Sequence, residues 1–185
     1  MKGKLVYKFL GVLSIIIAVS CSNNESKTEE KSTLVYTHFT DFEDTTIKVE
    51  VKGDAHSGNF FSRADSSNIY GSGFIFNVHD SLLQADAKVK FEGWVRVGDL
   101  SHNKEFALSL EDGNGHVLKW EKIDFRSHIA ETNKWIQVVE SVTFPANIIN
   151  RNGLIIKSYS FNPDGKSTLD CDDIKLSFYK IKAVQ

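Results

Sequence analysis

The sequence has few of the residues that mark membrane bundles, disulfide scaffolds or nucleic-acid-binding proteins. Apolar residues make up 41% of the chain and charged residues 25%, so one globular domain with a sizeable core is expected rather than a membrane bundle. The 22 basic residues are outnumbered by 24 acidic ones and form no stripe, so no nucleic-acid partner is expected. No sustained helical period or internal repeat is visible, which argues against helical bundles and repeat arrays.

Motifs for catalysis are also missing. The histidines are scattered singly and form no His-Glu-x-x-His segment: His38, His56, His79, His102, His116 and His128. In YGSGF, Tyr70 stands where a nucleophile elbow has its first glycine. Glu111 and Asp112 form the obvious carboxylate pair for glycoside hydrolysis, but Asp112 is better explained as the first residue of a hairpin turn. We therefore expect a protein that is not an enzyme.

The first twenty residues are typical of an export signal. A basic stretch, MKGKLVYK, precedes the apolar run FLGVLSIIIAVS, which is too short to span a bilayer comfortably. Small residues at Ala18 and Ser20, followed directly by Cys21, resemble a bacterial lipobox, in which the cysteine is lipidated and becomes the mature N-terminus. The alternative is an ordinary secretory signal with a coincidental cysteine. We predict a signal peptide at residues 1–20 and lipidation at Cys21.

Residues 21–33 are predicted to be a tether between the lipid and the folded domain. The stretch SNNESKTEEKST has no apolar residue and cannot pack. Its acidic character resembles the export signals that follow the lipidated cysteine in surface lipoproteins of Bacteroidetes-type bacteria. Membrane contact through the lipid, at the bacterial outer membrane, is the expected localisation. With Cys21 lipidated, Cys171 has no disulfide partner in the chain and is expected to be a packing residue.

Residues 34–185 are predicted to form one β-sandwich domain, because they alternate between strand-like runs and turn residues. The runs are STLVYTHF, TTIKVEVKG, GNFFSRA, GSGFIFNVH, AKVKFEGWVRVG, EFALSLED, HVLKWEKIDF, KWIQVVESVTF, GLIIKSYSF and CDDIKLSFYKI. The turn residues in EDGNGHV and NPDGKS tolerate the positive φ that hairpins require. Both prolines, Pro145 and Pro163, fall at run edges. An all-β fold, a sandwich or barrel, follows.

The last run, DCDDIKLSFYKI, contains an acid at an apolar position. If Ile174, Leu176 and Phe178 alternate into the core, Asp172 has the same parity and also points inward. A buried carboxylate needs a partner.

Five segments, in order, resemble the bacterial jelly-roll carbohydrate-binding modules of the galactose-binding-like superfamily: DFED, HSGNFF, AKVKFEGWVRVGD, NKWIQVVESVTF and LDCDDIKLSF. The resemblance spans about Val35 to Ile181 and implies an antiparallel jelly roll that binds a glycan. It also implies one structural calcium ion, held by Glu43 and Asp172 with backbone carbonyls, and calcium takes six to eight such oxygens. Two alternatives remain: Asp172 accepts hydrogen bonds from loop amides, or a bulge turns Asp173 inward instead.

The central run predicts where a sugar binds. Its residues Val89, Phe91, Val95 and Val97 share one parity and are expected between the sheets, whereas Lys88, Lys90, Glu92, Trp94 and Arg96 share the other. Trp94 and Arg96 are the leading carbohydrate-binding residues, because a flat ring offers an apolar face to a pyranose and a charged group bonds its hydroxyls. The alternative is that a loop or strand covers Trp94. Tyr70 is a further stacking candidate, as is Tyr159.

Trp120 and Trp135 are assigned to the core. The favoured interpretation is a lipid-anchored, non-catalytic carbohydrate-binding module. The alternative is an envelope lipoprotein whose jelly roll contacts another envelope protein, and fold does not decide between them.

Overall fold

The strands follow the alternation of apolar and polar residues. In β5 (Asp86–Val97) every second side chain is buried, from Ala87 to Val97, and the residues between them are half-buried. This pattern is expected for a strand with one face in a core, and it confirms the predicted facing of the central run. The computed structural model describes residues 32–44 and 50–181. The predicted signal peptide, Cys21 and most of the tether lie outside these residues.

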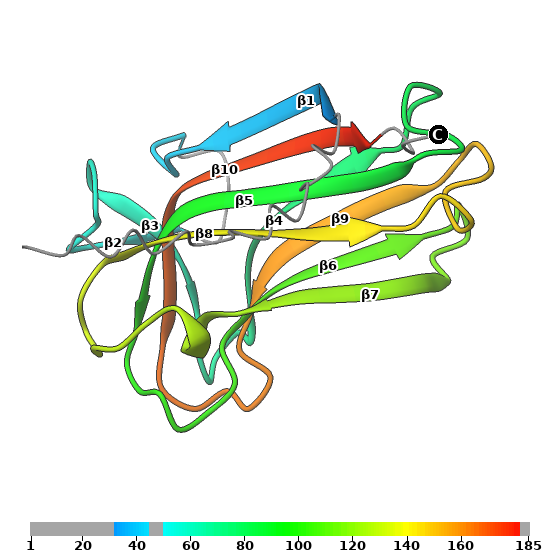
Figure 1. Cartoon of the computed structure of the whole chain (residues 1–185). Helices are drawn as coiled ribbons and strands as arrows, with labels where there is room; N and C mark the ends of the chain where they lie inside the picture. The colour runs from blue at the N-terminus through cyan, green and yellow to red at the C-terminus, as the bar shows by residue number, and fades with distance from the viewer. Residues whose placement is uncertain (1–31, 45–49, 182–185) are drawn as a thin grey trace, which may run out of the picture.

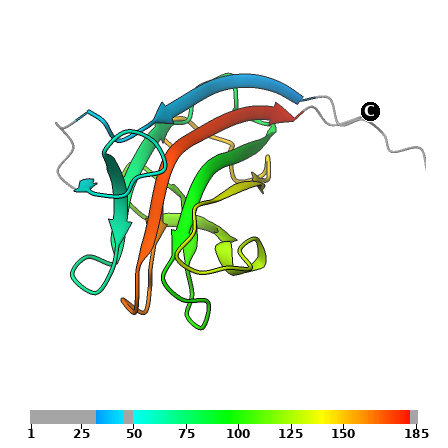
Figure 2. The same ribbon diagram turned by 90° about the vertical axis from the view of Figure 1, so that its left-hand side faces the viewer.

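The described residues form two antiparallel sheets packed face to face (Figures 1 and 2). The other strands are β1 (Ser32–Thr40), β2 (Glu50–Lys52), β3 (Phe60–Ala64), β4 (Tyr70–Asn77), β6 (Glu105–Glu111), β7 (Val117–Asp124), β8 (Ile136–Phe144), β9 (Ile155–Phe161) and β10 (Leu169–Ile181). A short 3-10 turn, η1 (Phe125–Ser127), follows β7. The prediction of an all-β antiparallel sandwich is confirmed. Within the described residues, no helix has the length and apolar character needed to cross a membrane.

The six-stranded sheet has the order β2-β3-β10-β5-β8, and β1 pairs with the second half of β10. The four-stranded sheet has the order β4-β9-β6-β7. Side chains from the two inner faces meet in one core, in which the rings of Phe91 and Phe106 lie 4.6 Å apart and bridge the sheets. Cys171 is fully buried in this core, as expected for a packing residue, and burial raises the pKa of its thiol far above the usual value.

A β-bulge in β10 changes the facing of the residues before it. Asp172 lies opposite Trp94 of β5 and Lys175 lies opposite Glu92, so β10 carries one extra residue in this stretch. Asp173, inside the bulge, has a φ of 47°. Side chains of a strand point alternately to its two faces. The extra residue therefore reverses which alternate positions face the core, so positions before the bulge have the opposite facing from the one expected by counting back from positions after it.

The inward placement of Asp172 is therefore wrong. Beyond the bulge Ile174 faces the core, and before the bulge it is Cys171 that does so. Asp172 instead shares the outer face of the sheet with Trp94. It is nevertheless fully buried, because the loop 53–59 between β2 and β3 covers it. One alternative from the sequence is a bulge that turns Asp173 inward. The bulge is present, but Asp173, like Asp172, forms hydrogen bonds with this loop and does not point between the sheets.

Candidate functional sites

Two carboxylates hold the loop 53–59 against the six-stranded sheet. Asp172 Oδ2 accepts hydrogen bonds from the amides of His56 at 2.8 Å and Ser57 at 3.1 Å, while its Oδ1 accepts from the Asp173 amide at 2.8 Å. Glu43 Oε1 accepts from the amides of Asn59 and Phe60, at 2.7 and 2.8 Å. These carboxylate oxygens accept hydrogen bonds from backbone N–H groups of a loop that is itself largely exposed. The interpretation in which loop amides bond to Asp172 is thus observed.

The pKa values of the two acids move in opposite directions. Burial raises the pKa of Asp172, and the amide bonds from the loop oppose this shift. The amides of Asn59 and Phe60 lower the pKa of Glu43. Gly58 makes the close approach of the loop possible, since it has a φ of +61° and a Cβ there would lie 2.3 Å from Glu43 Oε1.

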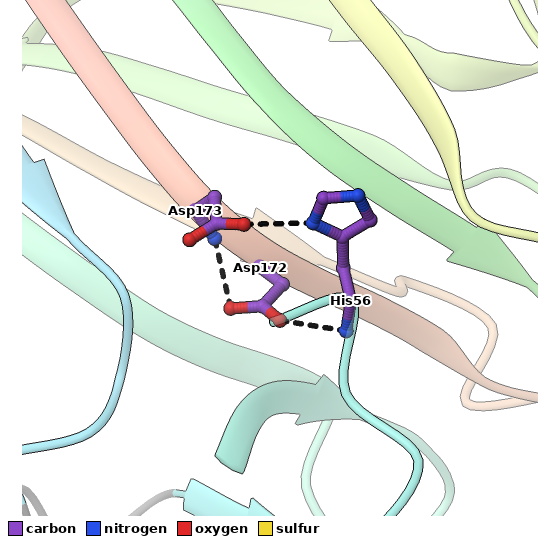
Figure 3. Close-up of side chains that lie close together, drawn as sticks. All are labelled: His56, Asp172 and Asp173. Atoms are coloured by element: carbon purple, nitrogen blue, oxygen red, sulfur yellow. Dashed lines mark hydrogen bonds and ion pairs between the residues drawn. The ribbon is translucent and has the colours of Figure 1, made fainter. Parts of the chain in front are cut away.

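His56, Asp172 and Asp173 form a group that could hold a metal ion (Figure 3). One ligand atom of each residue lies within 4.8 Å of the others, and His56 Nδ1 is 2.7 Å from Asp173 Oδ2. Asp172, expected to ligate calcium, belongs to this group, whereas Glu43 does not. The carboxylates are suitable calcium donors, but both oxygens of Asp172 already accept amide hydrogen bonds in this arrangement.

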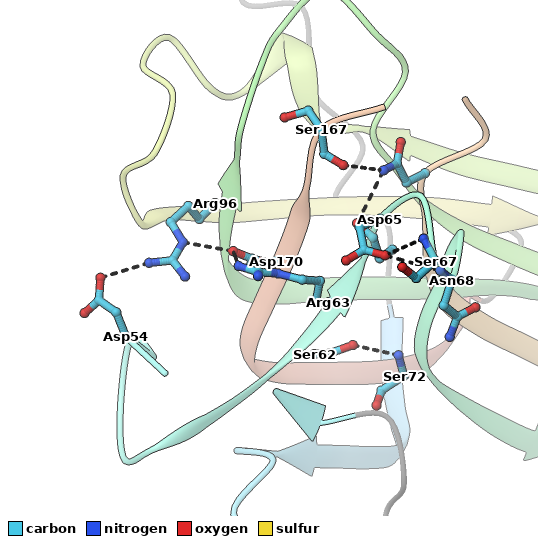
Figure 4. Close-up of polar contacts among 12 residues, drawn as sticks. Asp54, Ser62, Arg63, Asp65, Ser67, Asn68, Ser72, Arg96, Ser167 and Asp170 are labelled. Carbon is cyan, nitrogen blue, oxygen red and sulfur yellow. Dashed lines mark hydrogen bonds and ion pairs between the residues drawn. The ribbon is translucent and has the colours of Figure 1, made fainter. Parts of the chain in front are cut away.

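Arg96 lies in a network of buried and half-buried charges (Figure 4). Its Nε donates to Asp170 at 3.0 Å, and Arg63 donates to the same buried carboxylate at 2.7 and 3.0 Å. Arg96 also bonds Asp54 at 3.0 Å, and its guanidinium carbon lies 4.4 Å from the centre of the Trp135 ring. With its side chain 13% exposed, Arg96 is engaged within the protein rather than presented to a ligand.

Trp94 is covered by the same loop. Its ring stacks on His56 with centroids 3.8 Å apart and planes 13° from parallel. The interpretation in which a loop covers Trp94 therefore describes the structure. Trp135, expected in the core, instead packs beside Arg96 with its indole N–H bonded to the Asp54 carbonyl at 3.2 Å.

The outer face of the four-stranded sheet carries a different set of aromatic residues. We name the rings of Tyr70, Trp120, Tyr159 and Phe161 the aromatic platform. Tyr70 stacks on Phe161 at 5.1 Å with planes 7° apart, and Trp120 meets Tyr159 edge-on at 5.9 Å. Tyr70 is 47% exposed and Trp120 39%, so the expectation that Trp120 is a core residue is wrong.

Two small residues of β6, both fully buried, lie next to these rings. Ala107 lies opposite Tyr159, and Ser109 lies opposite Trp120. Next to them is an open depression of about 470 Å³, lined by Tyr70, Gly71, Gly73, Phe74, Ile75, Glu111, Lys157, Ser158 and Tyr159. Tyr70, predicted from the sequence, is thus part of a surface depression, and Tyr159 borders it as well.

Ion pairs flank the small residues of β6. Glu105 pairs with Lys122 at 2.6 Å, and Glu111 pairs with Lys157 at 2.5 Å. Burial alone would raise the pKa of Glu111, but Lys157 and the Ser109 hydroxyl outweigh it, so the pKa is lowered. Glu111 is therefore ionised at neutral pH, and each of the two carboxylates is paired with a lysine.

Sequence reasoning missed this face, although a signal for it exists. Trp120 shares parity with Lys122, and Tyr159 shares parity with Lys157, so each aromatic ring alternates with a residue that rarely lies in a core. The same alternation in β5 correctly placed Trp94 on an outer face. It could not show that a loop from elsewhere in the chain covers that face.

No family model matches the chain, and no curated protein does either. Solved structures with a similar fold include the CBM22-1 xylan-binding domain of Paenibacillus barcinonensis Xyn10C, which has a TM-score of 0.46 and 15% identity and covers 84% of this chain and 99% of its own. The CBM22-2 xylan-binding domain of the same protein has a TM-score of 0.41 and 14% identity, over 82% of this chain and 88% of its own. A family 16 carbohydrate-binding module has a TM-score of 0.43 and 14% identity, over 69% of this chain and 82% of its own.

Removing the Asp172 carboxylate should release the loop 53–59. In Asp172→Ala the amides of His56 and Ser57 lose their acceptor, so we expect the free energy of unfolding to fall by about 1–3 kcal/mol. Urea denaturation measures this loss, and amide hydrogen exchange should accelerate at both residues. The control is Asp54→Ala, since the Asp54 side chain is 91% exposed and its pair with Arg96 should contribute less than about 1 kcal/mol. Equal losses in the two variants would contradict the role given to Asp172.

Proposed function

We propose that this protein is a non-catalytic carbohydrate-binding module whose ligand lies on the aromatic platform of the four-stranded sheet. The observation that carries the proposal is a cluster of rings in which exposed Tyr70 stacks on half-buried Phe161, with Tyr159 and exposed Trp120 beside them. Aromatic rings exposed together on a sheet are unusual for a surface that stays in water, and such patches mark binding sites.

The platform has the two kinds of group that a sugar requires. Pyranose rings present apolar C–H faces, which pack on the flat faces of Tyr70 and Trp120. Their hydroxyls need donors and acceptors, and the Glu111–Lys157 pair supplies both at the edge of the depression.

This placement differs from the one predicted from the sequence. Trp94 and Arg96 lie on the other sheet, where His56 covers the ring and two carboxylates bind the guanidinium. A sugar at Trp94 would have to displace a loop held by the Asp172 and Glu43 hydrogen bonds. Tyr70 is the predicted contact that remains exposed.

A glycan array followed by affinity electrophoresis tests the proposal. We expect Trp120→Ala and Tyr70→Ala to weaken binding about tenfold or more each, equivalent to about 1.4 kcal/mol. Trp94→Ala is the matched control, since it removes the same ring from the other sheet and should leave affinity within twofold. Circular dichroism confirms that each variant is folded.

Two outcomes would overturn this placement. Loss of binding in Trp94→Ala but not in Trp120→Ala would move the site to the six-stranded sheet. Absence of binding across plant, algal and host glycans would favour the alternative, in which the jelly roll contacts another envelope protein.

We further propose that the protein is anchored in the bacterial outer membrane by lipid on Cys21, on the strength of residues 1–33 alone. In a bacterial host, the mature protein should begin at Cys21 and carry acyl groups, detected by mass spectrometry of the N-terminal peptide. Cys21→Ser should abolish the added mass. A mature protein that starts elsewhere, without acyl groups, would instead indicate an ordinary secretory signal.

Calcium binding by Glu43 and Asp172 is a separate proposal. An ion held at these carboxylates would replace amide hydrogen bonds of the loop 53–59 with ionic contacts. At a free calcium concentration about 100 times its dissociation constant, the folded state should gain roughly 2.7 kcal/mol. Thermal melts with calcium and with a chelator measure the gain, and an identical midpoint in both would show that the carboxylates serve the loop amides alone.

A further inference from the structure

A second cavity lies on the opposite side of the four-stranded sheet from the aromatic platform. It opens between the two sheets, at the side where β1 and β4 face each other. In the described part of the chain, β1 pairs with β10 and β4 pairs with β9. Backbone hydrogen bonds between β1 and β4 therefore do not join the two sheets on this side. The cavity has a volume of about 400 Å³. Its lining consists of His38, Phe39, Thr40, Asp41, Phe42, Asp44, Ser72, Gly73, Phe74, Phe106, Ser158, Ile174 and Leu176.

The inner wall of the cavity is apolar. Phe106, Ile174 and Leu176 line it and belong to the buried core, so a guest here would contact core side chains directly. Cavities of a few hundred Å³ with mainly apolar walls and a few polar groups are the usual form of small-molecule sites. The volume is large enough for a substituted aromatic ring.

The outer part of the cavity offers hydrogen bonds without a positive charge. His38 stacks on Phe74 with ring centroids 3.8 Å apart, and its ring nitrogens have no hydrogen-bond partner among the described residues. Burial lowers the pKa of His38, so the ring is neutral at pH 7 and has one donor and one acceptor nitrogen. Ser72 also lines the cavity, and its buried hydroxyl likewise lacks a partner within the described residues.

An acidic residue near the opening of the cavity affects which ligand charge is favoured. Asp41 is exposed and lines the cavity, so a carboxylate lies near its opening. A ligand with a carboxylate, such as a fatty acid, would meet a like charge and a neutral imidazole. A neutral guest meets neither penalty.

We propose that this cavity binds a small neutral aromatic alcohol, with its ring against the apolar wall and its hydroxyl bonded to His38. The rings of the aromatic platform lie on the outer face of the four-stranded sheet and the cavity on its inner face, although the depression beside the platform and the cavity share Gly73, Phe74 and Ser158 in their linings. The proposal adds a second ligand class to the same domain.

Benzyl alcohol, toluene and benzoate serve as probes of matched size. We expect benzyl alcohol to bind the purified full-length protein at least tenfold more tightly than benzoate. In NMR titrations, the shifts should concentrate on Phe74, Ile174 and Leu176. Toluene should bind more weakly than the alcohol, because it cannot bond to the imidazole.

Two variants separate the contributions. His38→Phe keeps a ring stacked on Phe74 but removes the nitrogens, so it should abolish the preference for the alcohol over toluene. Ser72→Leu places a larger side chain in the cavity and should weaken all three probes at least tenfold. Trp120→Ala, on the aromatic platform, is the control and should leave probe binding unchanged.

Several results would overturn the proposal. These are shifts that fall outside the cavity, benzoate binding as tightly as the alcohol, or a His38→Phe variant that retains the preference. If Ser72→Leu does not fold, the positions of the NMR shift changes and the relative affinities of the three probes for the unmodified protein still test the proposal.

Discussion

The hydrogen bonds from the loop 53–59 to Asp172 determine the surface of the six-stranded sheet. They exist because a bulge in β10 turns this carboxylate away from the core, onto the face it shares with Trp94. Once the loop is held there, His56 stacks on Trp94 and Asp54 reaches Arg96. One extra residue in a strand thus converts an open aromatic surface into a covered one.

The two outer faces of the sandwich consequently differ in kind. On the six-stranded sheet, charges are satisfied within the protein, and Asp170 binds two arginines at once. On the four-stranded sheet no comparable loop from residues 32–44 or 50–181 lies over the aromatic platform, and each buried glutamate is paired with a lysine at the edge. A face with exposed rings and no net excess of charge suits a neutral polyhydroxylated ligand better than an ionic one.

Much of the fold could be predicted because strand formation depends largely on residues that are close together in the sequence. The alternation in β5 identified its core face correctly, and the turn residues separated the runs. The site was harder to predict. Parity identified Trp94 as outward-facing but could not show the covering loop. The assignment of Trp120 to the core failed because its face of β7 is open to solvent, as Leu118 on the same face, 38% exposed, also shows.

The sequence by itself determined the fold class and the orientation of β5, because both depend on a period of two along a strand. Tertiary structure alone decided which partner Asp172 has and which aromatic rings reach water. Both depend on contacts between segments far apart in the chain, such as His56 with Asp172 and Tyr70 with Phe161. No local pattern encodes such pairs, since register and bulges are set by the packing of the whole sheet.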